Sequence, residues 1–178
     1  MKRQSLSKLS AQALLGLHSE VGRELRRRGI CRSSNNPVAD YAEGVVAKAL
    51  RLKLASGSTT GFDATDARGK RYEIKARRLT SAAKATMLSA IRGMERRHFD
   101  FLVAVVFNED YTVNKAVQIP YGTVARIAKY RKHVNAYIVM IRDMWDARGA
   151  RDITAELAKA SNRDLQPTAA GEIVRRRG

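Results

Sequence analysis

Residues 61–78 of the chain read GFDATDARGKRYEIKARR, and they predict a β-hairpin. Its strands are expected over residues 61–66 and 70–78, joined by a turn centred on Arg68. Gly69 stands in the turn where a left-handed backbone is wanted. Apolar and charged residues alternate along the second strand, so one of its faces is apolar and the other is charged.

This turn places Asp63 directly opposite Glu73 on the charged face. Opposed side chains have Cβ atoms roughly 4.5–5.5 Å apart, so two like charges there repel unless something neutralises them. Carboxylate oxygens are the hard ligands that Mg²⁺ prefers. Lys75 follows on the same face, where its ammonium could orient or help deprotonate an attacking water. The prediction depends on the register, because a one-residue slip would turn Asp63 to the other face.

The charge of the chain indicates a polyanionic partner. Lys and Arg total 34 against 17 acidic residues in 178, which gives a net charge of +17. Such a surplus attracts nucleic acid without regard to sequence. The basic side chains around the hairpin are expected to hold a DNA backbone, namely Arg71, Arg77, Arg78 and Lys84. A merely soluble basic surface is the alternative.

The rest of the composition excludes several classes of protein. A single cysteine, Cys31, rules out an internal disulfide framework and a cysteine-rich zinc site. No run approaches the ~20 apolar residues of a membrane span. No membrane partner is therefore expected, and a reducing cytoplasm is the expected location.

Two helices are expected before the hairpin. Residues 6–29 have apolar positions at helical spacing, and Gly29 supplies the stop. A second helix opens at Pro37, where the missing N–H of proline is not needed. Glu43 leans toward the core side of this second helix, where a carboxylate is costly unless it is paired. A salt bridge and a functional role both explain Glu43, and the pattern does not choose between them.

Elements of both kinds are expected after the hairpin. Residues 81–93 are expected to form a helix or a structured loop, and the apolar residues 99–107 a central strand. The following elements are expected as a strand, helix, strand and helix, over residues 112–119 (ended by Pro120), 121–132, 134–141 and 152–160.

Three runs together resemble the PD-(D/E)XK nuclease superfamily, in a small bacterial restriction-endonuclease-like branch. They are DYAE at 40–43, GFDA at 61–64 and YEIKARR at 72–78. The resemblance covers roughly residues 35–145. Phe62 stands where the motif has its proline, which is a departure. The resemblance implies an α/β fold: a mixed central β-sheet flanked by helices, in the order helix, three strands, helix, strand.

The resemblance also implies a role for each site residue. Asp63 and Glu73 would be metal ligands for Mg²⁺, with Mn²⁺ as a substitute, and the Ile74 carbonyl would be a further ligand. Lys75 would be the catalytic lysine. Glu43 would be the acidic residue of the first core helix, binding the metal directly or through water.

The expected organisation is an N-terminal helix over 1–30, a restriction-endonuclease-like domain over 31–160 and a basic tail over 161–178. The leading hypothesis is a magnesium-dependent endonuclease that hydrolyses DNA phosphodiester bonds. Cutting both strands needs two sites, so a homodimer is plausible. The alternatives are a non-catalytic DNA-binding protein on the same fold and a basic structural protein of a ribonucleoprotein or capsid.

Overall fold

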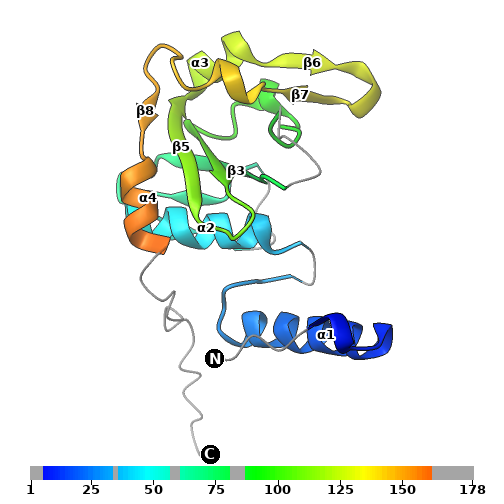
Figure 1. The fold of residues 1–178 in the computed structure, drawn as a ribbon. Helices are drawn as coiled ribbons and strands as arrows, with labels where there is room; N and C mark the ends of the chain where they lie inside the picture. The colour runs from blue at the N-terminus through cyan, green and yellow to red at the C-terminus, as the bar shows by residue number, and fades with distance from the viewer. Residues whose placement is uncertain (1–5, 34–35, 57–60, 81–86, 162–178) are drawn as a thin grey trace, which may run out of the picture. The chain divides into compact units, whose positions relative to one another are not determined.

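The structure, a computed structural model, describes residues 6–33, 36–56, 61–80 and 87–161 (Figure 1). The chain divides into two compact units. The smaller unit comprises residues 1–37 and 165–178, and the larger one comprises residues 38–164. The whole six-stranded sheet belongs to the larger unit.

The smaller unit contains the expected N-terminal helix. A short 3-10 helix, η1 (Leu6–Lys8), precedes the α-helix α1 (Ala11–Arg27). The Ser10 side chain accepts a hydrogen bond from the Ala13 N–H at 3.2 Å, and this cap starts α1 later than the periodicity predicted. Gly29 follows the helix with φ of 68°, which confirms the predicted stop.

The larger unit is mixed α/β, as expected. Its sheet has the strand order β1-β2-β3-β4-β5-β8. Only β3 and β4 are parallel, and the other neighbouring strands are antiparallel. The strands are β1 (Lys53–Leu54), β2 (Ala64–Thr65), β3 (Arg71–Arg78), β4 (Phe101–Phe107), β5 (Val113–Pro120) and β8 (Arg151–Asp152). The two outermost strands, β1 and β8, were not predicted, because two-residue strands have no periodicity to detect.

Three α-helices and three 3-10 helices accompany these strands in the described part of the larger unit. They are α2 (Pro37–Leu50), α3 (Tyr121–Ile127), α4 (Thr154–Ser161), η2 (Met94–Arg96), η3 (Lys132–Val134) and η4 (Ile141–Asp143). α2 begins at Pro37 as predicted. Pro120 ends β5 and directly precedes α3, which confirms its expected role as a strand stop.

The helix expected over residues 121–132 and the strand expected over residues 134–141 are each wrong in part, because the observed helix α3 and strand β7 (Ala136–Ile138) are both shorter. The helix expected over 121–132 ends at Ile127, because Ala128 is extended with ψ of 140°. Lys129–Arg131 form a strand, β6, which pairs with β7 (Ala136–Ile138) in a separate two-stranded sheet. Cross-strand pairing has here overridden a helical pattern that contains no glycine or proline after Gly122 to stop it.

The connection from β3 to β4 is a loop over its described part. Residues 87–93 contain no helix, so of the two expected structures only the structured loop is found there. The loop is tied to the second half of the chain by antiparallel bridges from Met87 to Met140 and from Ile91 to Tyr137. Residues 81–86 and the basic tail expected at the C-terminus lie outside the described residues.

Both faces of the central strand β4 are covered. Leu102 and Ala104 belong to a buried cluster on one face, together with Leu88, Ile91, Met94, Phe99, Val117, Ile119, Val124, Val139 and Met144. Successive residues of a strand point to opposite faces. Phe107 accordingly lies on the other face, where its ring centroid is 5.3 Å from that of Tyr41 in α2. The predicted central strand is therefore confirmed.

The register places the charged face of the hairpin. Glu73 and Lys75 of β3 pair with Leu102 and Ala104 of β4. Paired residues of neighbouring strands point to the same face. Both charged side chains therefore stand on the face covered by the loop 87–99.

Candidate functional site

The turn of the β2–β3 hairpin has the predicted centre. Ala64 pairs with Tyr72, which leaves Arg68 in the middle of the turn. Gly69 has φ of 75°, the left-handed conformation expected for it. The Asp66 carboxylate accepts a hydrogen bond from the Arg68 N–H at 2.9 Å and so closes the turn. The predicted register is confirmed for Ala64–Tyr72 and Thr65–Arg71, whereas Asp63 lies outside the paired residues, so its pairing with Glu73 stays a prediction.

Asp63 lies one residue before β2 and is held by backbone groups on both sides. Its N–H donates to the Tyr72 carbonyl at 2.8 Å, and its carbonyl accepts from the Ala55 N–H at 2.8 Å. Its side-chain Oδ2 accepts from the Ile74 N–H at 2.6 Å. The carboxylate thus takes the place of a strand acceptor, and this fixes its orientation and leaves Oδ1 for another partner.

Glu73 and Lys75 form a short ion pair on the charged face. Lys75 Nζ is 2.6 Å from Glu73 Oε1, and the Glu73 side chain is only 12% exposed. Burial raises the pKa of the Glu73 carboxyl above its ordinary value; the Lys75 ammonium opposes this shift, and the charge of Asp63 adds to it. Lys75 brings one positive charge to two neighbouring carboxylates, one of them largely buried, so the site suits a further positive ligand.

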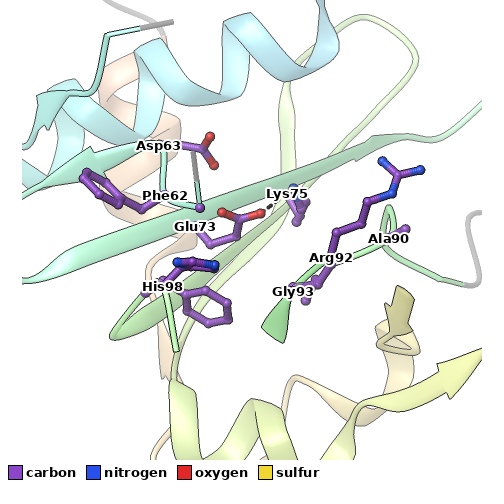
Figure 2. Close-up of a pocket in the computed structure, with 11 residues that line it drawn as sticks. Phe62, Asp63, Glu73, Lys75, Ala90, Arg92, Gly93 and His98 are labelled. Carbon is purple, nitrogen blue, oxygen red and sulfur yellow. Dashed lines mark ion pairs between the residues drawn. The ribbon is translucent and has the colours of Figure 1, made fainter. Parts of the chain in front are cut away.

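These three side chains line one pocket of about 220 Å³ (Figure 2). Figure 2 shows Asp63, Glu73 and Lys75 on one side of the pocket, facing side chains of the loop that covers β3. The remaining lining residues are Gly61, Phe62, Ala90, Ile91, Arg92, Gly93, His98 and Phe99. The structure therefore gathers the three central residues of the prediction in one concave place.

The opposite wall contributes two groups that the sequence analysis missed, Arg92 and His98. His98 is half-buried, and Arg92 is exposed at the pocket. A methyl group at Gly61 would lie 2.5 Å from His98 Cγ, so the imidazole packs directly on this glycine. Gly61 has φ of 98°, which is a second reason for glycine there. Neither side chain follows a local pattern, because both reach the site only through the fold of the loop.

Glu43 is not one of the residues that line the pocket. It is half-buried in α2, where it has an interaction partner. Its neighbour Tyr41 packs against Phe107, on the face of the sheet opposite to Glu73 and Lys75. A role for Glu43 at the site stays a prediction.

The arginines predicted to hold DNA contact the protein itself. Arg71 Nη2 donates to the Arg97 carbonyl at 3.0 Å, and Arg77 Nε donates to the Met87 carbonyl at 3.1 Å. Arg78 donates to the Glu109 carbonyl and lies over the Tyr111 ring, 4.8 Å from its centroid. Each is at least partly accessible, so these contacts leave the DNA-binding prediction open. Lys84 lies outside the described residues.

The residues present fit a hydrated Mg²⁺. Mg²⁺ usually keeps several waters and takes one or two carboxylates from the protein. Asp63 and Glu73 supply two carboxylates. The Ile74 N–H donates to the Asp63 carboxylate. The N–H and the carbonyl of one strand residue point to the same side, so the Ile74 carbonyl also points toward Asp63. The described pairs of β2 with β3 end at Tyr72, so this carbonyl is not paired with β2. In the described ranges no group of three or more His, Cys, Asp and Glu side chains could hold a metal, so waters would complete this set.

Comparison with known proteins adds no relative. No protein-family model matches the chain, and no curated protein matches it. Among the described residues no helix is both long and apolar enough to cross a bilayer.

Proposed function

We propose that this protein is a magnesium-dependent endonuclease that hydrolyses phosphodiester bonds in DNA. The observation that carries the proposal is the pocket in which Asp63, Glu73 and Lys75 meet. A buried carboxylate with a raised pKa, a second carboxylate and a lysine in one concave site are a frequent signature of catalysis. The single free cysteine, Cys31, is consistent with a cytoplasmic location.

The arrangement of strands also supports a PD-(D/E)XK core. The antiparallel set β1-β2-β3 followed by the parallel strand β4 agrees with the strand pattern that the motif resemblance implies. Two departures accompany it. Phe62 replaces the proline of the motif, and residues 87–100 contain only the short η2 where a helix would be expected.

Each residue has a distinct task in the proposed reaction. Asp63, Glu73 and the Ile74 carbonyl hold the cation, and Lys75 orients the attacking water or stabilises charge on the phosphate. A bound Mg²⁺ polarises the phosphate and lowers the pKa of water. Attack by water on phosphorus breaks the bond to the 3′ oxygen and leaves a 5′-phosphate and a 3′-hydroxyl. The reaction consumes only water.

The net charge of +17 supports a polyanionic substrate. A homodimer would bring two sites to the two strands of a duplex, and this assembly is part of the proposal. A non-catalytic DNA-binding protein on the same fold is the second candidate. It is favoured by the 2.6 Å Glu73–Lys75 ion pair, which neutralises the buried carboxylate without any metal.

A plasmid-nicking assay separates the two candidates. The purified chain is incubated with Mg²⁺, with Mn²⁺ and with EDTA, beside Lys75→Ala and the control Lys53→Ala, which removes an exposed lysine on β1. We expect metal-dependent nicking that is lost in Lys75→Ala and kept in Lys53→Ala. Retained binding without nicking under either metal would favour the DNA-binding protein, and equal nicking by both variants would exclude Lys75 from the site.

A further inference from the structure

The two-stranded sheet forms a separate ribbon, residues 129–138, which we call the basic ribbon. It comprises β6 and β7, joined by η3. Figure 1 shows it in yellow, projecting from the larger unit away from the six-stranded sheet. Residues 129–135 are all exposed, so one strand and the turn form an accessible edge.

The charge of this edge has one sign. Lys129, Arg131 and Lys132 lie on β6 and the turn, with His133 beside them. No acidic residue occurs in the sequence between Asp110 and Asp143. Within the described residues, none of the three Lys and Arg side chains forms an ion pair. These cations are therefore available to an external anion.

The ribbon is held in one shape by its aromatic side chains. Tyr130 pairs with Tyr137 across the strands, and their ring centroids are 5.2 Å apart. The Tyr130 hydroxyl donates to Asn135 Oδ1 at 2.8 Å and ties the strand to the turn. A surface that is already ordered loses less conformational entropy when it binds a partner.

The ribbon is also continuous with the wall of the candidate site. Ile91 lines the pocket, and its N–H and carbonyl both bond to Tyr137, each at 2.9 Å. The Leu88 N–H donates to the Val139 carbonyl at 3.0 Å in the same pairing. The ribbon is thus positioned relative to the pocket by backbone hydrogen bonds, and Arg92 adds a cation at the pocket itself.

We propose that the basic ribbon enters the major groove of duplex DNA and contacts its phosphates through Lys129, Arg131 and Lys132. The major groove of B-form DNA, about 12 Å wide, admits a two-stranded β-ribbon. This inference rests on the proposed function, which names DNA as the partner. It assigns DNA binding to a surface outside the catalytic pocket.

Protection of an exposed strand edge against aggregation would also explain lysines on β6. Edge protection does not explain Lys132, which lies in the turn, where no ladder continues. One carboxylate approaches the ribbon from the pocket loop: Glu95 hydrogen-bonds the Tyr137 hydroxyl and raises the pKa of this tyrosine. Glu95 therefore lies at β7. The β6 edge and the turn have no acidic neighbour in the sequence.

The test compares two triple variants of equal charge in the full chain. Lys129→Ala/Arg131→Ala/Lys132→Ala changes the ribbon, and Lys53→Ala/Arg68→Ala/Lys159→Ala removes three exposed cations elsewhere. Duplex DNA binding is measured by fluorescence anisotropy in EDTA over a series of salt concentrations. Each phosphate contact contributes about 0.9 to the slope of log affinity against log salt, so the ribbon variant should lose about 2.7. Its affinity should fall at least about tenfold at ~0.1 M salt, while the control stays near wild type.

Equal changes in the two triple variants would overturn the proposal, as would wild-type protein that does not bind duplex DNA. Duplex RNA separates groove entry from plain charge, because the major groove of A-form RNA is too deep and narrow for side chains to read. Equal loss of RNA and DNA binding by the ribbon variant would overturn groove entry.

A second pair of variants covers the case in which the triple ribbon variant does not fold. His133→Glu and Ala67→Glu each add one carboxylate to an exposed hairpin turn. Only the first should weaken DNA binding. Because cleavage is not measured in EDTA, failure of this inference is distinct from failure of the proposed nuclease, which is detected only in the plasmid assay.

Discussion

Two hairpins of the larger unit, β2–β3 and the basic ribbon, differ in where their charged side chains lie. In the β2–β3 hairpin the charged side chains face a covered pocket, and Glu73 and Lys75 neutralise each other. In the basic ribbon the charged side chains face solvent and have no ionic partner in the described part of the chain. Partners inside a buried site restrict a charge to one geometry, whereas exposed cations keep their attraction for an outside anion.

Asp63 gives the largest expected effect, because its carboxylate has a structural and a functional role. Asp63→Ala leaves the Ile74 N–H without its acceptor, which should cost about 1–3 kcal/mol of unfolding free energy. It should also abolish Mn²⁺ binding. Denaturant unfolding measures the first effect, and the Mn²⁺-induced rise in melting temperature measures the second.

Asp63→Asn is the matched control for this prediction. The amide oxygen can still accept from the Ile74 N–H, so stability should stay near wild type while Mn²⁺ binding is lost. If Asp63→Asn keeps the Mn²⁺-induced stabilisation, Asp63 is not a metal ligand.

Gly61→Ala tests the wall of the pocket and should have the next largest effect. A methyl group there meets His98 at 2.5 Å and adopts an unfavourable φ of 98°, so we expect a loss of roughly 1–3 kcal/mol. Gly69→Ala shares the positive φ but has open space, so it should lose only about 1 kcal/mol. Equal midpoints of chemical denaturation for the two variants would show that the contact with His98 does not affect stability.

Glu73→Gln tests whether the buried carboxylate is costly without a metal. Since the pKa of Glu73 is raised in the folded state, its contribution to stability is fully present below the unfolded value near 4.5 and is lost as pH rises through the folded value. In EDTA at neutral pH, Glu73→Gln should therefore unfold at a slightly higher temperature than wild type. Melting temperatures measured from acid to neutral pH check the sign, and a larger wild-type advantage at neutral pH would contradict it.

The smallest expected effect is that of the basic ribbon on stability. Lys129→Ala and Arg131→Ala remove exposed side chains without ionic partners, so each should change the unfolding free energy by less than about 0.5 kcal/mol. A larger loss in thermal denaturation would mean that these residues are structural.

Local rules account for the part of the fold that could be predicted from the sequence. The hairpin register follows from the turn around Arg68 and Gly69 and from strict alternation in β3. The apolar run of β4 identifies a strand covered on both faces, and Pro120 ends the next one. Each of these features depends on residues close together in the chain, which is why the amino-acid sequence alone indicates that Asp63 and Glu73 lie near each other, as the shared pocket shows.

Long-range packing decided the rest. The parallel pairing of β3 with β4 carries the loop 87–99 over the charged face, and only this loop brings His98 and Arg92 to the pocket. The ribbon arises because residues 129–131 find a partner strand after Ala128, although their pattern favours a helix. Sequence periodicity indicates which local conformations a segment favours. It carries no information on the free energy of contacts between distant segments. The charged residues of the site could therefore be predicted from the sequence. The loop that covers them and the projecting basic ribbon were decided only by the tertiary structure.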